Sequence, residues 1–162
     1  MSEKRKLDQE TVDRMLRSHK NWAYPYLEDG PGYPADLSNT DLRGVTLSER
    51  QKSYLKGINL EGANLSGMDM RGAKLLRANL KGAKLENTNF ENASLQYVNA
   101  EGADLSGANF TDANLGRANL ENADLKGANF RNANLKGANQ PKVTLTDADL
   151  SGLNESNKDM EL

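Results

Sequence analysis

Large apolar side chains recur at every fifth position through most of this chain. Between Leu55 and Leu150 that position holds Leu, Phe or Met, except at Ala100 and Gln140. A small residue, usually Ala, stands two positions earlier, and Asn or Asp usually lies between the two. A period of five suits neither regular element, because successive units would turn by about 140° on a helix and would alternate between faces on a strand. Every unit must therefore contain a turn.

Turn residues recur with the same period. Gly or Asn dominates the position two after the large residue, and both residue types tolerate positive φ. The large residue and the small one before it can then both point inward, while the remaining positions face water. This pattern predicts an all-β solenoid whose coils hydrogen-bond to one another at a spacing of about 4.8 Å.

Columns of like residues indicate how many units make one coil. The phenylalanines Phe90, Phe110 and Phe130 are twenty residues apart, and Met70 and Leu150 extend their series. We expect these residues to stack as a structural core column. A second column with the same spacing consists of Asn59, Asn79, Asn99, Asn119 and Asn139. Stacked amides can pair along such a column. Both columns predict four units per coil.

The repeated unit resembles that of the pentapeptide repeat family. The pattern A-(N/D)-(L/F)-x-x is carried by units such as Ala63-Asn64-Leu65-Ser66-Gly67 and Ala108-Asn109-Phe110-Thr111-Asp112. The match covers residues 53–152, with an imperfect extension through 35–49. The resemblance implies a right-handed quadrilateral β-helix with the large and small residues inside.

Departures from the pattern predict local irregularities. Val98 enlarges a small position while Ala100 shrinks the next large one, which is a volume-compensating exchange. Gln140 places an amide at an inward site and precedes Pro141, so we expect a disturbed coil there. Residues 48–52 should bulge or turn, because the run before them keeps the five-residue spacing in another phase. That run consists of Leu37, Leu42 and Leu47.

The ends of the solenoid need covers, because stacked coils leave unpaired backbone groups and apolar surface at each end. Residues 8–22 have helical periodicity, with Asp8 as N-cap and an apolar face formed by Val12, Met15, Leu16 and His19. We therefore expect residues 1–34 to form a capping α-helix and an aromatic, Pro-rich connector, 35–152 the solenoid, and 153–162 a tail. The connector is either part of the cap or a binding surface. The tail either covers the last coil or leaves an end that pairs with a second copy, so a monomer and an end-to-end homodimer both stay open.

Charge argues against one function found in this family, the protection of DNA gyrase by mimicry of duplex DNA. Such mimicry needs a strongly negative surface. Residues 56–152 contain equal numbers of basic and acidic groups, and the net charge of −2 arises in the tail. A basic cluster at 71–84 precedes an acidic stretch at 85–116, which predicts either surface pairing between neighbouring coils or a docking face for a protein.

One outward column, Arg77, Tyr97 and Arg117, has the spacing of twenty, and Leu76 lies beside Arg77. Tyr and Arg are frequent anchors of protein interfaces, and they also form cation–π stacks. These residues are therefore possible protein-binding residues, with a purely structural stack as the alternative.

The sequence contains no motif for catalysis. It has no cysteine, one histidine, and neither a phosphate loop nor a zinc-protease motif. We therefore expect no enzyme activity, no catalytic residues, no cofactor and no metal site. No domain is net basic, which argues against nucleic acid, and no apolar stretch is long enough for a membrane span. The expected function is a cytoplasmic interaction or regulatory scaffold for an unidentified protein partner, and the alternative is gyrase protection.

Overall fold

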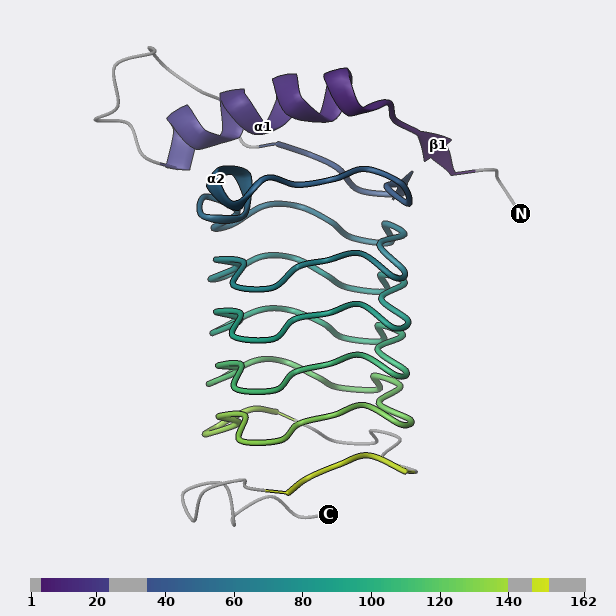
Figure 1. The fold of residues 1–162 in the computed structure, drawn as a ribbon, viewed down its shortest axis with the longest axis vertical. Coiled ribbons are helices and arrows are strands. Elements are labelled where there is room, and N and C mark those ends of the chain that lie inside the picture. The colour runs from purple at the N-terminus through teal and green to yellow at the C-terminus, as the bar shows by residue number, and fades with distance from the viewer. Residues whose placement is uncertain (1–3, 24–34, 140–146, 152–162) are drawn as a thin grey trace.

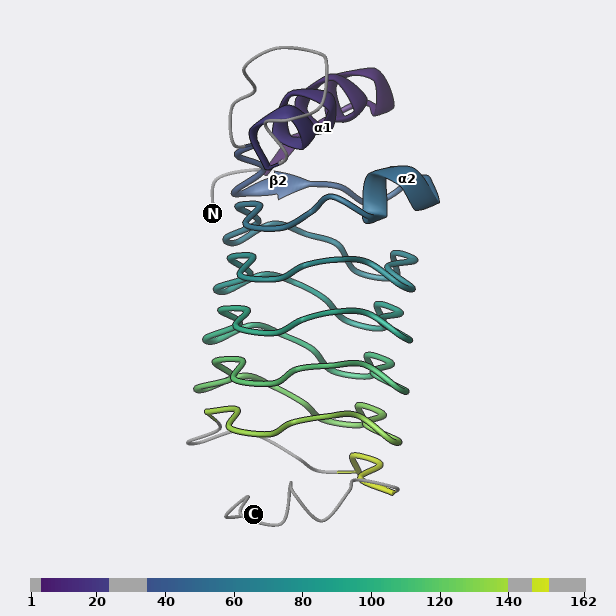
Figure 2. The same cartoon turned by 90° about the vertical axis from the view of Figure 1, so that its left-hand side faces the viewer.

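A computed structural model defines residues 4–23, 35–139 and 147–151 (Figures 1 and 2). The elements follow the order β1 (Arg5–Lys6), α1 (Gln9–Ala23), β2 (Thr40–Asp41) and α2 (Glu49–Lys52). A stack of coils then runs away from α1, which lies across the first coil (Figure 1). The predicted quadrilateral β-helix with an N-terminal helix is confirmed.

Adjacent coils are joined by short parallel bridges between residues twenty apart. Asn79, for example, bridges both Asn59 and Asn99. The Leu60 N–H donates to the Asn79 carbonyl oxygen over 2.8 Å, and the Asn79 N–H donates to that of Ile58 over 2.9 Å. Each unit also closes its own turn, as in the 3.0 Å bond from the Ala63 N–H to the Leu60 carbonyl oxygen. The backbone is thus paired along the walls and turned at every corner.

The interior of the rod is filled by the large and small residues of each unit. The Phe90 and Phe110 rings are fully buried and stack with their centroids 5.3 Å apart. Met70 is likewise buried above them. Leu150, expected in the core column, is only partly buried, because it belongs to the last described coil. The column that the spacing of twenty predicts is therefore present, and it is less enclosed at its end.

The asparagine column forms a ladder of side-chain amides on the outside. The Asn79 Nδ2 donates to the Asn59 Oδ1 over 3.1 Å, and Asn119 donates in the same way to Asn99 over 3.2 Å. In Asn59, Asn79, Asn99 and Asn119 the Oδ1 also accepts the N–H two residues later, as in the 3.2 Å bond from Glu61 to Asn59. One amide thus supports both the turn and the stacking of coils.

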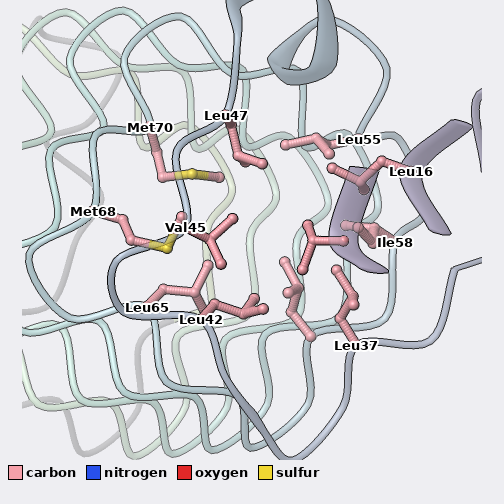
Figure 3. A pocket seen from close by; sticks show the side chains of 12 residues that line it. Leu16, Leu37, Leu42, Val45, Leu47, Leu55, Ile58, Leu65, Met68 and Met70 are labelled. Carbon is pink, nitrogen blue, oxygen red and sulfur yellow. The ribbon is translucent and has the colours of Figure 1, made fainter. Parts of the chain in front are cut away.

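Helix α1 covers the apolar end of the stack. It begins after Asp8, whose Oδ1 accepts the Thr11 N–H over 2.8 Å, so the predicted N-cap is confirmed. Val12 and Leu16 are buried against the first coils, where apolar side chains converge (Figure 3). The apolar cavity left between α1 and the first coils has a volume of about 10 Å³, which is room for one water-sized molecule at most. The helix therefore fills the end of the rod.

A short helix, α2 (Glu49–Lys52), lies within residues 48–52, where the sequence predicted a bulge or turn. Ser48 and Gln51 build a capping box at its start. The extra residues shift the pairing of the first coil, so that Asp36 bridges Asn59 at a separation of 23 residues instead of twenty. Lys52 is buried, and its Nζ lies 3.0 Å from Glu49 and 3.4 Å from Asp69.

Strand β1 was not predicted. It pairs in parallel with β2, so Arg5 is opposite Thr40, and it extends one wall beyond the first coil. The expected disturbance at Gln140 and Pro141, the aromatic connector and the tail at 153–162 lie outside the described residues. In the part of the chain that the structure describes, no helix has the length and apolar character needed to cross a membrane.

Candidate functional site

One wall of the rod carries basic residues and no acidic ones. We call it the basic wall, and it consists of the outward side chains of units 53–57, 73–77, 93–97, 113–117 and 133–137. Within the described ranges, none of its cations takes part in an ion pair. These cations are all exposed side chains: Lys56, Lys74, Arg77, Arg117 and Lys136.

The other three walls mix both signs, with more acidic than basic residues among their described positions. The wall that follows the basic wall along the chain carries Glu61, Lys81, Glu101 and Glu121. The wall that precedes it carries Asp69, Arg71, Glu91, Asp112, Arg131 and Asp149. The wall opposite carries Lys84, Glu86, Asp104, Asp124, Lys126 and Asp147. The balanced total therefore conceals a strong asymmetry around the rod.

Several cations on the mixed walls have acidic partners close by. The Lys81 Nζ lies 3.0 Å from Glu101 in the next coil, which is the pairing expected for the basic and acidic stretches, and this contact raises the pKa of Lys81. Arg71 instead pairs with Asp69 in its own unit at 2.8 Å, and its hydrogen bonds hold the pKa of that carboxyl well below its usual range. The cations of the basic wall have no such partners among the described residues.

The centre of the basic wall is a stack of three side chains. The Tyr97 ring lies between two guanidinium groups, with the Arg77 Cζ 5.7 Å and the Arg117 Cζ 5.6 Å from its centroid. The Arg117 Nη1 also donates to the Tyr97 hydroxyl over 3.1 Å. Leu76 is half-buried beside them. The structure thus brings the four possible protein-binding residues onto one wall, where both readings of this column, stack and binding surface, have a physical basis.

The backbone of this column is unusual. Arg77, Tyr97 and Arg117 have φ values of 59°, 58° and 59°, in the left-handed region that bulky side chains rarely adopt. Every other non-glycine residue with positive φ in the described ranges is Asn or Asp. These short polar side chains tolerate that conformation, whereas Tyr and Arg do so at an energetic cost. All the bulky exceptions therefore lie in one column.

A shallow hollow of about 460 Å³ opens beside the stack. The residues that line it include Tyr97, Gly116, Arg117 and Lys136. Among the described glycines, Gly116 alone does not have positive φ, so the turn does not require glycine at this position. The equivalent positions of the neighbouring coils carry Gln96 and Lys136. The missing side chain at Gly116 therefore creates the depression.

Amide groups line the rest of the hollow. The Asn134 Nδ2 donates to the Asn114 Oδ1 over 3.2 Å, and that oxygen also accepts the Gly116 N–H over 3.0 Å. The Lys136 N–H donates to the Asn134 Oδ1 over 3.0 Å. These bonds hold the amides in place beside the cations Arg117 and Lys136.

This arrangement suits binding. The hollow is open, and an exposed wall offers little of the desolvation that catalytic groups require. Across residues 4–23, 35–139 and 147–151, no cluster of His, Asp or Glu side chains is placed to hold a metal ion. A rigid surface with an exposed aromatic ring between two guanidinium groups can instead contact a macromolecular partner.

Sequence reasoning identified the central column and missed the wall around it. Lys56 and Lys136 were not singled out, and Lys74 was placed only in the basic cluster at 71–84, because charges were counted along the chain and not around the coil. Grouping charged residues by their position within each set of twenty would have revealed the basic wall. Gly116 was also missed, because glycine is common in this repeat.

Comparisons with known proteins agree with this architecture. The model for pentapeptide repeats matches residues 53–92, 75–112 and 113–152, in eight copies. No curated protein sequence matches significantly. Among solved structures, a pentapeptide repeat protein from the Arabidopsis thaliana thylakoid lumen is 32% identical with a TM-score of 0.50, and the alignment covers 66% of this chain and 72% of that one.

Two cyanobacterial proteins of solved structure are also similar. Rfr23 from Cyanothece 51142 is 37% identical, with a TM-score of 0.39, over 60% of this chain and 59% of that one. HetL from Nostoc sp. strain PCC 7120, which is involved in the regulation of heterocyst differentiation, is 29% identical, with a TM-score of 0.43, over 76% and 65%. This chain thus spans less than two thirds of the length of either protein. The repeat model covers more than half of the chain, which therefore belongs to the pentapeptide repeat family.

Proposed function

We propose that this protein is a non-enzymatic interaction module that binds a protein partner through the column Arg77, Tyr97 and Arg117. The observation that carries the proposal is the left-handed backbone of all three residues. Elsewhere in the described chain, this turn position is filled by Gly, Asn or Asp. Bulky side chains in a strained backbone conformation cluster at functional sites, where the strain is retained for a purpose other than folding.

The chemistry of the column supports an interface. Tyr97 is the one large hydrophobic side chain that is exposed among the described residues, with 46% of its surface accessible. The two guanidinium groups hold its ring in place, so little side-chain entropy remains to be lost on binding. Tyr and Arg are among the residue types most often found to dominate the energy of protein interfaces.

Gyrase protection by DNA mimicry has less support. A mimic of duplex DNA needs a continuous negative face, because the partner's surface is complementary to a polyanion. Each of the three mixed walls carries at least one cation among its described residues, such as Lys81, Lys84 or Arg131. The remaining wall is basic. The charge distribution therefore favours a different class of partner.

Affinity capture with quantitative mass spectrometry tests the proposal. The bait is the full chain, compared with the double variant Tyr97→Asn and Arg117→Asn, which replaces the column with residues that suit the turn. The control, Asn92→Gly with Asn132→Gly, changes the same turn position on another wall. We expect at least one partner whose recovery falls tenfold or more with the column variant and is unchanged with the control.

A supercoiling assay with DNA gyrase addresses the alternative. We expect neither inhibition of the enzyme by the protein nor protection from a gyrase poison. If the column variant retained every partner of the unchanged protein, or if protection of gyrase were observed, the proposed function would be wrong.

A further inference from the structure

We propose that the basic wall recognises an extended acidic segment of a protein partner, with carboxylates along the line from Arg77 to Lys136 and the segment's backbone over the hollow at Gly116. The inference rests on the proposed function and names the chemistry of the partner. It depends on the charge of the whole wall and on the shape of the hollow, and neither entered the argument for the central column.

The charge of the basic wall is complementary to that of an acidic segment. The five cations of the wall are exposed and free of ion pairs with the described residues. Lys56 and Lys136 lie four coils apart, which is about 19 Å at the spacing of β-strands. A row of unpaired like charges on one face raises the local potential and attracts a partner of opposite sign. The wall therefore offers a carboxylate-rich segment several contacts in a line.

The hollow at Gly116 gives the backbone of such a segment room to approach the wall. An extended segment needs a place where its backbone can approach, and Gly116 provides one between Tyr97 and Lys136. Guanidinium groups can bind carboxylates with two parallel hydrogen bonds, and Arg117 is among the residues that line the hollow. The aliphatic part of Arg117 packs near Gly137, where an added Cβ would lie 3.4 Å from the Arg117 Cγ. A side chain at either glycine would reduce the space.

The width of the basic wall favours a peptide over a nucleic acid as its partner. Each wall is one pentapeptide unit wide, and its flat part spans about three extended residues, on the order of 10 Å. The two adjoining walls carry acidic side chains, among them Glu101, Glu121 and Asp112. A duplex would extend over both edges and bring its phosphates near these carboxylates. A single extended peptide fits between them.

Fluorescence anisotropy tests the proposal with the full chain. The probe is a labelled ten-residue peptide that alternates Glu with Gly, and the reference is the Gln–Gly peptide of the same length. We expect the Glu–Gly peptide to bind at least tenfold more tightly than the reference at low salt, with an affinity that falls as salt rises. A single-stranded oligonucleotide of equal charge should bind more weakly than the acidic peptide.

Three variants locate the binding. Arg117→Gln with Lys136→Gln removes two charges, and Gly116→Gln fills the hollow with the side chain that the coil before it already carries. Each should weaken the Glu–Gly peptide at least tenfold. The control Arg131→Gln removes one exposed charge from an adjoining wall and should change the affinity less than twofold. Thermal unfolding of each variant establishes that it is folded.

The possible failures are distinguishable. Three results would overturn the acidic-segment proposal. They are equal affinity for the Glu–Gly and Gln–Gly peptides, tighter binding of the oligonucleotide than of the Glu–Gly peptide, and a loss of affinity in Arg131→Gln as large as in the basic-wall variants. If the peptide test failed but capture of a partner still depended on the column, the proposed function would stand and only the acidic-segment proposal would be wrong. Loss of column-dependent capture would remove the proposed function itself.

Discussion

The ring of Phe130 lies 4.8 Å from the ring of Phe110, with the two planes only 10° apart. The residues are twenty apart in the chain and belong to neighbouring coils. Phe90 continues the stack on the other side, so both faces of the Phe110 ring are covered by aromatic surface. Parallel rings in register are possible here because the backbone bridges hold consecutive coils at the spacing of a β-sheet.

Replacing the central ring tests how much this stack stabilises the rod. Phe110→Ala should lower the free energy of unfolding by about 3–5 kcal/mol, as expected for a buried aromatic side chain. Phe110→Leu introduces the commonest large residue of the repeat and should lower the free energy of unfolding by less than about 1.5 kcal/mol. Urea unfolding measures both values. A loss below about 1 kcal/mol for the alanine variant would contradict an interior stack.

The sequence was sufficient to predict the fold because the repeat has one periodic solution. A period of five forces a turn in every unit, and the spacing of Phe90, Phe110 and Phe130 fixes the number of units per coil. Helix α1 was also predictable, since Val12, Leu16 and His19 lie at helical spacing after a good N-cap. These predictions depend only on residue types at fixed spacings in the chain, and in the solenoid the same spacing recurs in every unit.

Features without a repeat were not predictable. Strand β1 contains two residues, and its pairing with β2 depends on the path of the chain after Lys6. The burial of Lys52 depends on a contact with Asp69, which lies in the next coil. These two relationships arise from the three-dimensional stacking and have no local signal. The basic wall is different, because grouping charged residues by their position within each set of twenty reveals it.

The exchange at Val98 and Ala100 predicts a measurable coupling. The two residues line a small apolar cavity of about 10 Å³, so the pair fills the interior nearly as well as the usual Ala and Leu would. Ala100→Leu alone should overpack the coil and cost about 1–3 kcal/mol, because Val98 occupies part of the space. Adding Val98→Ala should recover most of this loss.

A double-mutant cycle by urea unfolding measures that coupling. The interaction energy should favour the double variant by about 0.5–3 kcal/mol, the range for residues in contact. Additive effects of the two changes would show that Val98 and Ala100 do not share one space.

The lid formed by α1 predicts a change in association. Leu16→Asp places a charge at a fully buried site and should detach the helix, because burying an unpaired carboxylate is strongly unfavourable. The uncovered end of the rod should then associate with other copies. Light scattering should detect larger species that grow with concentration. The control Glu10→Ala changes an exposed residue of the same helix, and its particle size should equal that of the unchanged protein. A detached helix with no increase in size would contradict the role of α1 as a lid.

The strained backbone of Tyr97 predicts an unusual order of stability. Tyr97→Ala removes the cation–π stack and leaves a Cβ in the left-handed region, whereas Tyr97→Asn supplies a residue that tolerates positive φ. The Asn variant should therefore be more stable than the Ala variant by about 1 kcal/mol. Thermal and urea unfolding provide the comparison. Asn92→Ala serves as the reference, since it imposes the same backbone conformation on Ala at another wall. Equal stability of the two Tyr97 variants would remove the argument from strain.

His19 predicts how stability depends on pH. Its Nδ1 accepts the Ala35 N–H over 3.1 Å, and its Nε2 lies 3.0 Å from the Lys56 carbonyl oxygen, so the buried ring is neutral with its proton on Nε2. Burial lowers the pKa of His19 below its ordinary value. The unfolded chain therefore binds this proton first as the pH falls below about 6.5, and unfolding becomes more favourable.

We accordingly expect constant stability from this group above about pH 6.5 and a progressive loss below it, which ends once the pH passes the lowered pKa of the folded state. His19 is the single histidine, and carboxyl groups such as Asp41, whose pKa is lowered to about 2 by Arg43, act at more acidic pH. Urea unfolding across this range should show the loss in the unchanged protein. In His19→Gln the curve should be flat between about pH 6.5 and the region where carboxyl groups begin to titrate, near pH 4. If both proteins lost stability equally, His19 would not be the group responsible.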